Sequence, residues 1–256
     1  MLSRFLSLFQ KKVEDKPPVV EEDVCIELEH QNERYCFHDT SYNGITTAQE
    51  VFDEIIKDCY RLDSIAFQPG DKVIDIGGHV GVFSVYLAKK HPEIEIFIYE
   101  PVPKNIVNIR KNLEKNGVKN VTVFEKGVAQ VSNQKIKFIK PVDQNTGGGT
   151  AQTNMIDSQS PSDLQRVIEI ETISLEDIFE TNQIEKCRLL KIDCEGAEHE
   201  ILMNTNKLPA IEHIRGEFHI NQRLKSEGYS ISKLEKHLRK YIPKKNLFYT
   251  PCNMCD

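Results

Sequence analysis

The stretch Lys72-Val-Ile-Asp-Ile-Gly-Gly-His-Val-Gly-Val-Phe-Ser84 predicts the fold of this chain. Its first part, 73–76, is an apolar run that is typical of a buried parallel strand. A glycine-rich turn follows, and apolar residues at helical spacing then continue from 82 to 90. Strand, glycine turn and helix in this order form the first unit of a nucleotide-binding α/β domain.

The chemistry of the turn follows from its backbone. Glycine has no Cβ, so it adopts positive φ and lets a ligand approach the main chain, while the helix start presents unpaired N–H groups. The spacing Asp-x-Gly-Gly-x-x-Gly departs from the dinucleotide fingerprint, and Asp75 ends the strand. A carboxylate there can accept a hydrogen bond from an ammonium group, which favours S-adenosylmethionine (SAM). The alternative is a tight turn in some other α/β protein.

Size and composition limit the class of protein. The chain has 256 residues, enough for one large domain or one domain with appendages. The formal net charge is -6 without a long basic block, so nucleic acid is not favoured as a partner. No apolar run is long enough to cross a bilayer. The 7 cysteines are scattered, so we expect them to be reduced and mostly buried in a cytoplasmic protein.

Both ends of the chain carry short patterns. Apolar residues in 1–12 fall on one helical face beside basic residues, which indicates either peripheral membrane contact or a helix that packs on the domain or frays. Cys252 and Cys255 form half of a tetrahedral metal site, but no second pair stands at zinc-finger spacing. We therefore interpret them as a tail with two exposed thiols.

From residue 69 onward, strands alternate with helices, which predicts a mostly parallel sheet with helices on both faces. Ligands of such sheets bind beyond the carboxyl ends of the strands. The polar segment 141–163 is predicted to be either a lid over the site or disordered. The predicted strands are 72–76, 94–99, 121–125, 136–139, 167–172, 189–192, 211–218 and 246–250, and 225–241 is predicted to be largely helical.

Acidic residues stand at three of these strand ends. Glu100 follows the second strand at a spacing where a carboxylate can accept both ribose hydroxyls, although a surface acid before Pro101 is the alternative. Asp193 could bind the amino-acid part of the cofactor, hold a substrate hydroxyl or act as a base. Glu195 and Glu198 could share this role or cap the next helix.

Glu217 and His219 lie on one face of a further strand. Histidine suits the removal of a hydroxyl proton near neutral pH, although a structural or solvated histidine is the alternative. The predicted catalytic residues are therefore Asp193, Glu217 and His219. A divalent metal is possible, with Asp193, Glu195 and Glu217 as ligands, but no sequence feature indicates one.

The motifs at 73–84, 99–101, 173–177 and 190–202 resemble those of the FkbM family of SAM-dependent methyltransferases, over roughly residues 70–230. The most specific part is Lys191-Ile-Asp-Cys-Glu-Gly-Ala-Glu198. The resemblance implies a class I methyltransferase (Rossmann-like) fold, an α/β fold whose seven-stranded, mostly parallel sheet ends in an antiparallel pair. The methyltransferase domain would span 69–256, after an N-terminal extension at 1–68 that holds a helix, linker, hairpin and second helix.

The resemblance also implies a cofactor and a reaction. SAM would donate its methyl group to a hydroxyl of a small molecule, sugar, glycan or glycolipid. An N-methyltransferase and a non-catalytic SAM-binding module remain alternatives, and the oligomeric state is not readable. Gly78 stands where the family usually has alanine, a difference that we expect to cost little. The cofactor-binding residues would be Asp75, Gly77, Gly78, His79, Gly81, Phe83, Ser84, Glu100, Pro101, Gly127 and Asp193.

Overall fold

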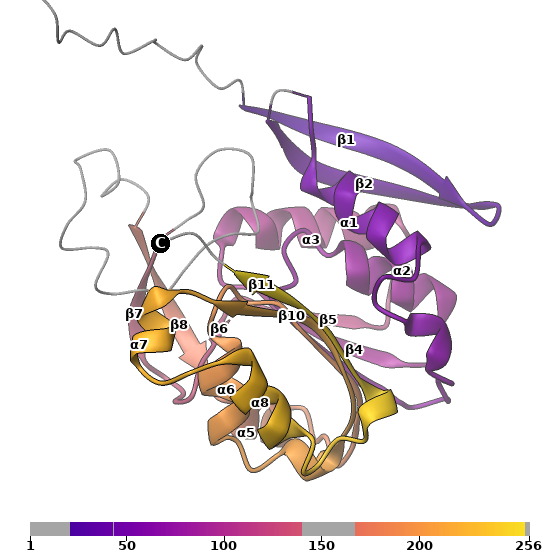
Figure 1. Ribbon diagram of the computed structural model, residues 1–256. Helices are drawn as coiled ribbons and strands as arrows, with labels where there is room; N and C mark the ends of the chain where they lie inside the picture. Colours follow the sequence, from indigo (N-terminus) through magenta and orange to yellow (C-terminus); the bar gives the residue numbers. More distant parts are fainter. Residues whose placement is uncertain (1–20, 43, 140–166, 254–256) are drawn as a thin grey trace, which may run out of the picture.

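The computed structural model describes residues 21–42, 44–139 and 167–253, and its centre is a six-stranded sheet (Figure 1). All neighbouring strands in this sheet are parallel. In chain order they run 3-2-1-4-5-6, the Rossmann order, so strand order reverses between the first and fourth strands. Across the sheet the strands are β5 (Val121–Phe124), β4 (Glu95–Tyr99), β3 (Lys72–Ile76), β9 (Cys187–Ile192), β10 (Ile211–Ile220) and β11 (Leu247–Asn253).

The Rossmann-like α/β fold is confirmed, but the expected strand count and final antiparallel pair are wrong for the described residues. The β11 strand pairs directly with β10, and its register runs parallel from Ile214 opposite Leu247. The physical reason is the connection, because two helices return the chain to the start of the sheet before β11 begins. These are α7 (Gln222–Ser226) and α8 (Ile231–Leu238), separated at Gly228, whose φ is 89°.

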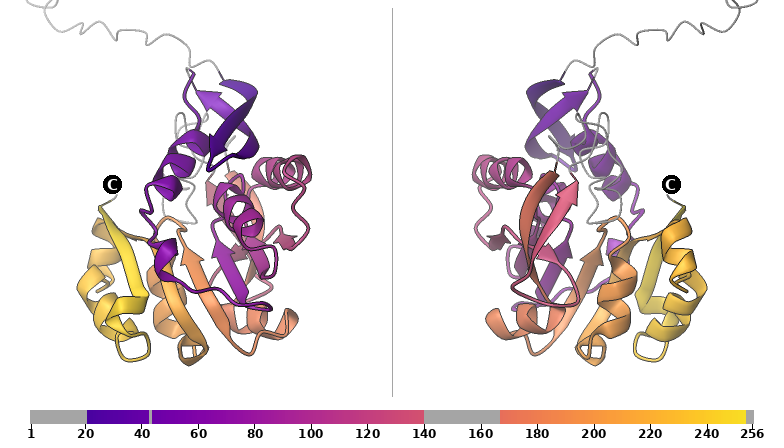
Figure 2. Two further views of the ribbon diagram at one scale, coloured as in Figure 1. Left: turned by 90° about the vertical axis from the view of Figure 1, so that its right-hand side faces the viewer. Right: turned by 90° about the vertical axis from the view of Figure 1, so that its left-hand side faces the viewer.

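Helices cover both faces of the sheet (Figures 1 and 2). Alternate residues of each buried strand point to opposite faces, so Val73 packs with the first helical layer and Ile74 with the second. The first layer holds α1 (Thr47–Ile56), α2 (Val82–Lys90) and α3 (Pro103–Lys115), and the second holds α5 (Leu175–Thr181), α6 (Glu198–Asn204) and α8.

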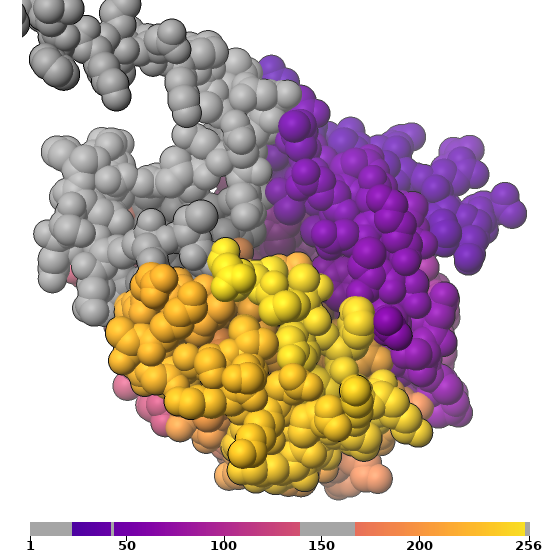
Figure 3. Space-filling model, viewed as in Figure 1, coloured from indigo at the N-terminus to yellow at the C-terminus, as the bar shows by residue number. Residues whose placement is uncertain are grey.

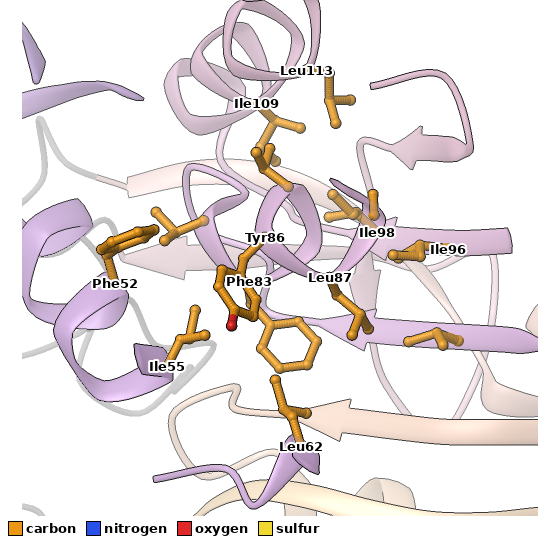
Figure 4. Close-up of a cluster of buried hydrophobic side chains, with 14 of the residues drawn as sticks. Phe52, Ile55, Leu62, Phe83, Tyr86, Leu87, Ile96, Ile98, Ile109 and Leu113 are labelled. Atoms are coloured by element: carbon orange, nitrogen blue, oxygen red, sulfur yellow. The ribbon is translucent and has the colours of Figure 1, made fainter. Parts of the chain in front are cut away.

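The N-terminal hairpin packs on the first helical layer. Strands β1 (Glu21–His30) and β2 (Glu33–Tyr42) are joined by two residues with positive φ, a turn that matches the twist of a hairpin. Tyr35 of β2 packs on Phe52 of α1 with ring centroids 5.0 Å apart. Phe52 and Ile55 lie in the same cluster as Phe83 of α2 (Figure 4). Residues 21–42 and 44–68 therefore share a hydrophobic core with the sheet, whereas the predicted helix at 1–12 lies outside the described residues.

The segment after Tyr60 also contacts the last two strands of the sheet, β10 and β11. The Arg61 guanidinium lies 4.5 Å from the centre of the Phe248 ring, and Arg215 of β10 donates a hydrogen bond to Ser64 Oγ at 3.1 Å. In the space-filling view, the N-terminal part in purple and the C-terminal part in yellow accordingly meet on one face (Figure 3).

A small second sheet follows β5, with strand order β6 (Gly127–Val128), β8 (Val167–Ile173) and β7 (Lys135–Ile139). Its apolar side chains pack with Val102, which precedes α3. The predicted polar loop at 141–163 lies outside the described residues.

Among the helices of the described ranges, none has the length and apolarity that crossing a membrane requires.

The prediction that the cysteines are mostly buried is wrong. Cys187 of β9 is buried, but Cys25 and Cys59 are exposed, and the other described cysteines are half-buried. The six described cysteines are free thiols. Apolar neighbours in sequence misled the prediction, because Cys25 alternates with the inward-facing residues of β1 and therefore faces outward.

Candidate active site

The glycine turn lies where the ends of β3 and β9 meet. Gly77 has a φ of 76°, and a Cβ at this position would lie 1.8 Å from the main-chain oxygen of Asp193. Gly81 also has positive φ and begins α2. Gly77 is therefore required by both its backbone conformation and the close approach of a neighbouring strand.

Gly78 is constrained in a different way. Its φ is not positive, but an added Cβ would lie 2.2 Å from Cγ2 of Ile98 in β4. That methyl group sits on a β-branched carbon and has little freedom to move. The structure therefore indicates that alanine at this position would force a local shift beside Ile98. The expectation that glycine costs little in place of the family's alanine stays a prediction.

A buried ion pair between Asp75 and Lys191 stabilises the glycine turn. Asp75 is fully buried, its Oδ2 accepts a hydrogen bond from Ser84 Oγ at 2.7 Å, and its Oδ1 lies 3.2 Å from Lys191 Nζ. Lys191 Nζ also donates to the Gly77 carbonyl oxygen at 2.8 Å. Burial lowers the pKa of Lys191, but the nearby carboxylates of Asp75 and Asp193 outweigh this effect and raise it. The sequence pattern does not reveal this role of Lys191, because the role depends on contacts with Asp75 and Gly77, which are far away in the sequence.

Glu100 stands at the end of β4 and is buried. Its Oε2 accepts the His79 N–H at 3.0 Å, and its Oε1 accepts the Val102 N–H at 2.9 Å and Asn105 Nδ2 at 3.2 Å. Burial raises the pKa of Glu100 to about 7, although these hydrogen bonds oppose the shift. Burial also lowers the pKa of His79 to about 3, so its imidazole is neutral. About four acceptor positions exist on a carboxylate, which leaves room for one ribose hydroxyl rather than two.

The glycine turn lines a cavity of about 680 Å³, a volume within the range of small-molecule sites. One end is apolar and is formed by the small sheet, with Val128, Ile136, Phe138 and Ile170. The other end is rich in carboxylates. The residues predicted from sequence that line the cavity are Gly77, Gly78, His79, Phe83, Glu100, Pro101, Gly127, Asp193 and Glu217, whereas Asp75, Gly81, Ser84 and His219 lie outside its lining.

The carboxylate end is built around His219. His219 is 5% exposed, and its Nδ1 lies 3.0 Å from Oε1 of the buried Glu198. Its Nε2 lies 3.5 Å from Glu217 Oε2, 3.6 Å from Glu195 Oε2 and 4.0 Å from Asp193 Oδ1. We call these three carboxylates with His219 the carboxylate–histidine cluster. His219 therefore lies behind carboxylates that face the cavity, instead of facing the acceptor space itself.

Charge and burial shift the ionisation of the cluster. Burial lowers the pKa of His219, but the hydrogen bond to Glu198 and the surrounding carboxylates outweigh burial and raise it to about 9. Burial raises the pKa of Glu195 to about 7 and also raises that of Asp193. Burial would also raise the pKa of Glu198, but His219 outweighs it and the pKa is lowered. At neutral pH, His219 is therefore protonated and Glu195 is partly protonated.

Glu198 has both of the roles considered from the sequence. Its carboxylate accepts the N–H groups of Cys194 at 2.8 Å and Gly196 at 3.0 Å, so it stabilises the turn before α6. The same carboxylate orients His219. Glu195, next to this turn, has a φ of 56°, a conformation that costs energy in a residue other than glycine and is common at functional sites.

The N-terminal extension supplies one wall of the carboxylate end. Glu50 and Glu54 of α1 line the cavity, and Tyr60 donates a hydrogen bond to Glu54 Oε2 at 3.2 Å. Arg223 and Leu224 of α7 also line the cavity. The sequence did not reveal these residues, because an amphipathic helix pattern predicts packing and does not show which polar residue borders a cavity.

The match to known families agrees with this geometry. The model of the methyltransferase FkbM domain matches residues 75–246, from the end of β3 to the start of β11. The chain belongs to the FkbM methyltransferase family. Its cofactor is SAM, and the fit is supported by the glycine turn, the Glu100 carboxylate at the end of β4 and the apolar slot formed by the small sheet.

Two curated relatives show how far the similarity extends. The chain is 25% identical to the 31-O-demethyl-FK506 methyltransferase FkbM of Streptomyces tacrolimicus over 195 residues, covering 67% of this chain and 75% of the relative. It is 26% identical to Methyltransferase 1 of Beauveria bassiana over 164 residues, covering 60% and 64%. The chain therefore spans less than two thirds of the Beauveria protein.

Solved structures are more distant. A SAM-dependent methyltransferase from Agrobacterium tumefaciens is 14% identical, with a TM-score of 0.33, and the alignment covers 66% of this chain and 39% of that one. Coclaurine N-methyltransferase bound to N-methylheliamine and SAH is 12% identical, with a TM-score of 0.32 and coverages of 79% and 35%. This chain spans less than half of either protein.

Proposed function

We propose that this protein transfers the methyl group of SAM to a hydroxyl oxygen of a small, hydroxyl-rich acceptor, such as a sugar unit of a glycan or glycolipid. The observation that carries the proposal is that Asp193, Glu195 and Glu217 line the same cavity as the glycine turn. Carboxylates accept hydrogen bonds from hydroxyl groups and can take their protons. The name of the Streptomyces relative, an enzyme for an O-demethyl compound, supports an oxygen acceptor.

The two ends of the cavity suggest how SAM is oriented. The adenine would occupy the apolar slot beside Phe138 and Ile170, and one ribose hydroxyl would donate to Glu100 Oε2. The methionine end would then extend along Gly77 towards Asp193. This orientation directs the methyl group to the carboxylate end, where an acceptor can enter between α1 and α7.

The reaction is an in-line displacement. The acceptor oxygen forms a bond to the methyl carbon while the bond from that carbon to sulfur breaks, and the electron pair stays on sulfur to give S-adenosylhomocysteine. The hydroxyl proton passes to the carboxylate of Asp193 and then to solvent. The sulfonium is already reactive, so the protein contributes mainly alignment and exclusion of water. His219, behind the carboxylates, acts as a positioning residue.

The test is methyl transfer by the full chain to a panel of neutral glycosides, glycolipids and amines, with and without added divalent cation. We expect S-adenosylhomocysteine release that depends on an acceptor, with the methyl group found on oxygen by mass spectrometry. Methylation of nitrogen would overturn the oxygen assignment, and absence of SAM binding by calorimetry would overturn the enzyme assignment. SAM binding without turnover on any acceptor would instead identify a binding module.

A further inference from the structure

The outward face of the N-terminal hairpin carries two thiols and an imidazole. In the register of β1 and β2, Cys25 lies opposite His38, and Glu27 lies opposite Cys36. Side chains two residues apart on a strand point to the same face, so these four side chains share one face. The sulfur atoms of Cys25 and Cys36 are 2.8 Å apart. Together with one ring nitrogen of His38, they form a group whose three donor atoms all lie within 4.8 Å of one another.

The main chain that carries two of these donors is held by α3, which lies beside β2 (Figure 1). Asn116 accepts the Cys36 N–H at 3.0 Å and donates to the Cys36 carbonyl oxygen at 2.7 Å. Asn112 makes the same pair of contacts with the His38 N–H at 2.6 Å and the His38 carbonyl oxygen at 3.1 Å. The outer edge of β2 is thus fixed at both donor residues. A fixed backbone lowers the cost of bringing ligands together.

We propose that Cys25, Cys36 and His38 bind a thiophilic divalent cation, Zn²⁺, with water at the fourth position. Two thiolates and an imidazole form a donor set that zinc uses in proteins, and thiolates select zinc over Mg²⁺ or Mn²⁺. Bonds of about 2.0–2.3 Å in a tetrahedron place neighbouring donors about 3.5–3.8 Å apart. The two sulfur atoms, at 2.8 Å, would therefore separate by about 1 Å, which rotation of the side chains can supply.

The placement of the two cysteines favours a metal over a disulfide. They are diagonal neighbours, because Cys25 is paired with His38 and Cys36 with Glu27. Cα atoms of diagonal neighbours lie about 7–8 Å apart, whereas a disulfide requires about 4.4–6.8 Å. A disulfide would therefore require the fixed edge of β2 to move, whereas a metal ion can bridge the two sulfur atoms without this movement.

Burial and two lysines of α3 set the ionisation of the donors. Burial and the charges of Lys111 and Lys115 lower the pKa of His38, so its imidazole is neutral and able to bind a metal. Burial and the hydrogen bond to Cys25 raise the pKa of Cys36 to about 11, so the metal has to displace its proton. Lys115 opposes that shift and thus stabilises the thiolate. Two thiolates then balance the charge of Zn²⁺.

The site is separate from the cavity and does not depend on the proposed function. Its three residues do not line the cavity. The residue after His38, Asp39, is buried and accepts the N–H of Ala48 at 2.8 Å in the first turn of α1. A metal that links β1 to β2 would therefore stabilise the part of the hairpin that supports α1. A ligand that binds only the folded state raises the temperature of unfolding.

The test uses the metal-free full chain in reducing buffer, titrated with Co²⁺ and then with Zn²⁺. Co²⁺ should give the ligand-field spectrum of a tetrahedral site and a thiolate-to-cobalt charge-transfer band, and Zn²⁺ should displace it. Cys25→Ser, Cys36→Ser and His38→Gln should each weaken binding by about tenfold or more. The controls are Cys59→Ser, an exposed cysteine outside the hairpin, and His30→Gln, a histidine of the same hairpin. Each should change the affinity less than about threefold.

Thermal unfolding supplies a second measurement and identifies any variant that fails to fold. Zn²⁺ should raise the unfolding temperature of the wild type and leave that of Cys36→Ser unchanged. Absence of bound Co²⁺ would overturn the site, and so would full affinity in His38→Gln. Binding that is lost in Cys252→Ser and retained in Cys25→Ser would assign the metal to the C-terminal cysteines and overturn the proposal. A disulfide between Cys25 and Cys36 that persists in reducing buffer, detected by mass spectrometry, would also overturn it.

Discussion

The two ends of the cavity are built by different means. The cofactor end depends on main-chain geometry, with Gly77 packed against the end of β9 and Glu100 held by N–H groups. The carboxylate end depends on side chains, and Glu50, Glu54 and Tyr60 precede the residues that match the family model. The family match covers both the glycine turn and the three carboxylates of the cluster, whereas the wall formed by Glu50, Glu54 and Tyr60 comes from this chain's N-terminal extension.

The largest effect should come from the cofactor end. Gly77→Ala places a Cβ 1.8 Å from the Asp193 oxygen at a φ of 76°, so we expect SAM affinity to fall at least 100-fold. We also expect a loss of about 2–5 kcal/mol in the free energy of unfolding. Calorimetry with SAM and chemical unfolding measure the two effects.

A matched control separates steric overlap from backbone strain. Gly70 has a similar φ of 82°, but an added Cβ would meet nothing within 4 Å. Gly70→Ala should cost about 1–2 kcal/mol of stability and leave SAM affinity unchanged. Equal effects of Gly77→Ala and Gly70→Ala on SAM affinity and stability would contradict the assignment, because they would show that the close approach of β3 and β9 does not determine SAM binding.

A smaller effect is expected at Glu100. Glu100→Ala removes the carboxylate proposed to accept a ribose hydroxyl, and a hydrogen bond to a charged group contributes about 1.5–3 kcal/mol. SAM should therefore bind about 10- to 100-fold more weakly by calorimetry. Glu114→Ala, on the exposed side of α3, removes the same charge and should leave binding unchanged. Normal SAM affinity in Glu100→Ala would place the ribose elsewhere.

The raised pKa of Glu100 predicts a pH dependence. Because its pKa is about 7, the carboxylate becomes protonated as pH falls below neutrality and then accepts a hydroxyl proton less well. The dissociation constant of SAM should rise about tenfold between pH 8 and pH 6. Glu100→Gln does not titrate, so its profile should be nearly flat. A wild-type profile as flat as that of the variant would contradict the assignment.

The smallest effect should be confined to the carboxylate end. Tyr60→Phe removes the donor to Glu54 Oε2, so we expect the KM for the acceptor to rise about three- to tenfold because a net hydrogen bond is worth about 0.5–1.5 kcal/mol. The dissociation constant of SAM should change less than twofold. Tyr35→Phe, in the same hydrophobic core but outside the cavity lining, is the control. A change in SAM affinity in Tyr60→Phe would show that the two ends are not separable.

The order of strands and helices was predictable because its signals are local. Ser174, for example, accepts the Asp177 N–H at 3.2 Å and begins α5, as the sequence spacing predicts. The direction of β11 was not predictable in this way. It depends on the end of the sheet to which α7 and α8 return the chain. The apolar run at 246–250 is equally compatible with a parallel and an antiparallel strand.

The candidate site likewise contains residues that local sequence signals predict and residues that depend on distant contacts. Residues that directly follow a strand, such as Glu100 and Asp193, could be selected because parallel strands end at one edge of the sheet. Lys191 and Tyr60 could not, since their relevance depends on contacts with Asp75 and Glu54 that no spacing encodes. The structure brings His219 close to Asp193 and Glu217, but its place behind the carboxylates depends on Glu198, and its part in catalysis stays a prediction.

Asp193 belongs to both ends through different atoms. Its N–H donates to the Ile76 oxygen at 3.1 Å, its carbonyl oxygen lies against Gly77, and its carboxylate lines the cavity. A single residue therefore contacts the glycine turn and lines the carboxylate end, so in the proposed function it would connect the cofactor with the acceptor. Thermodynamic linkage then requires reciprocity: the factor by which an acceptor alters SAM affinity equals the factor by which SAM alters acceptor affinity.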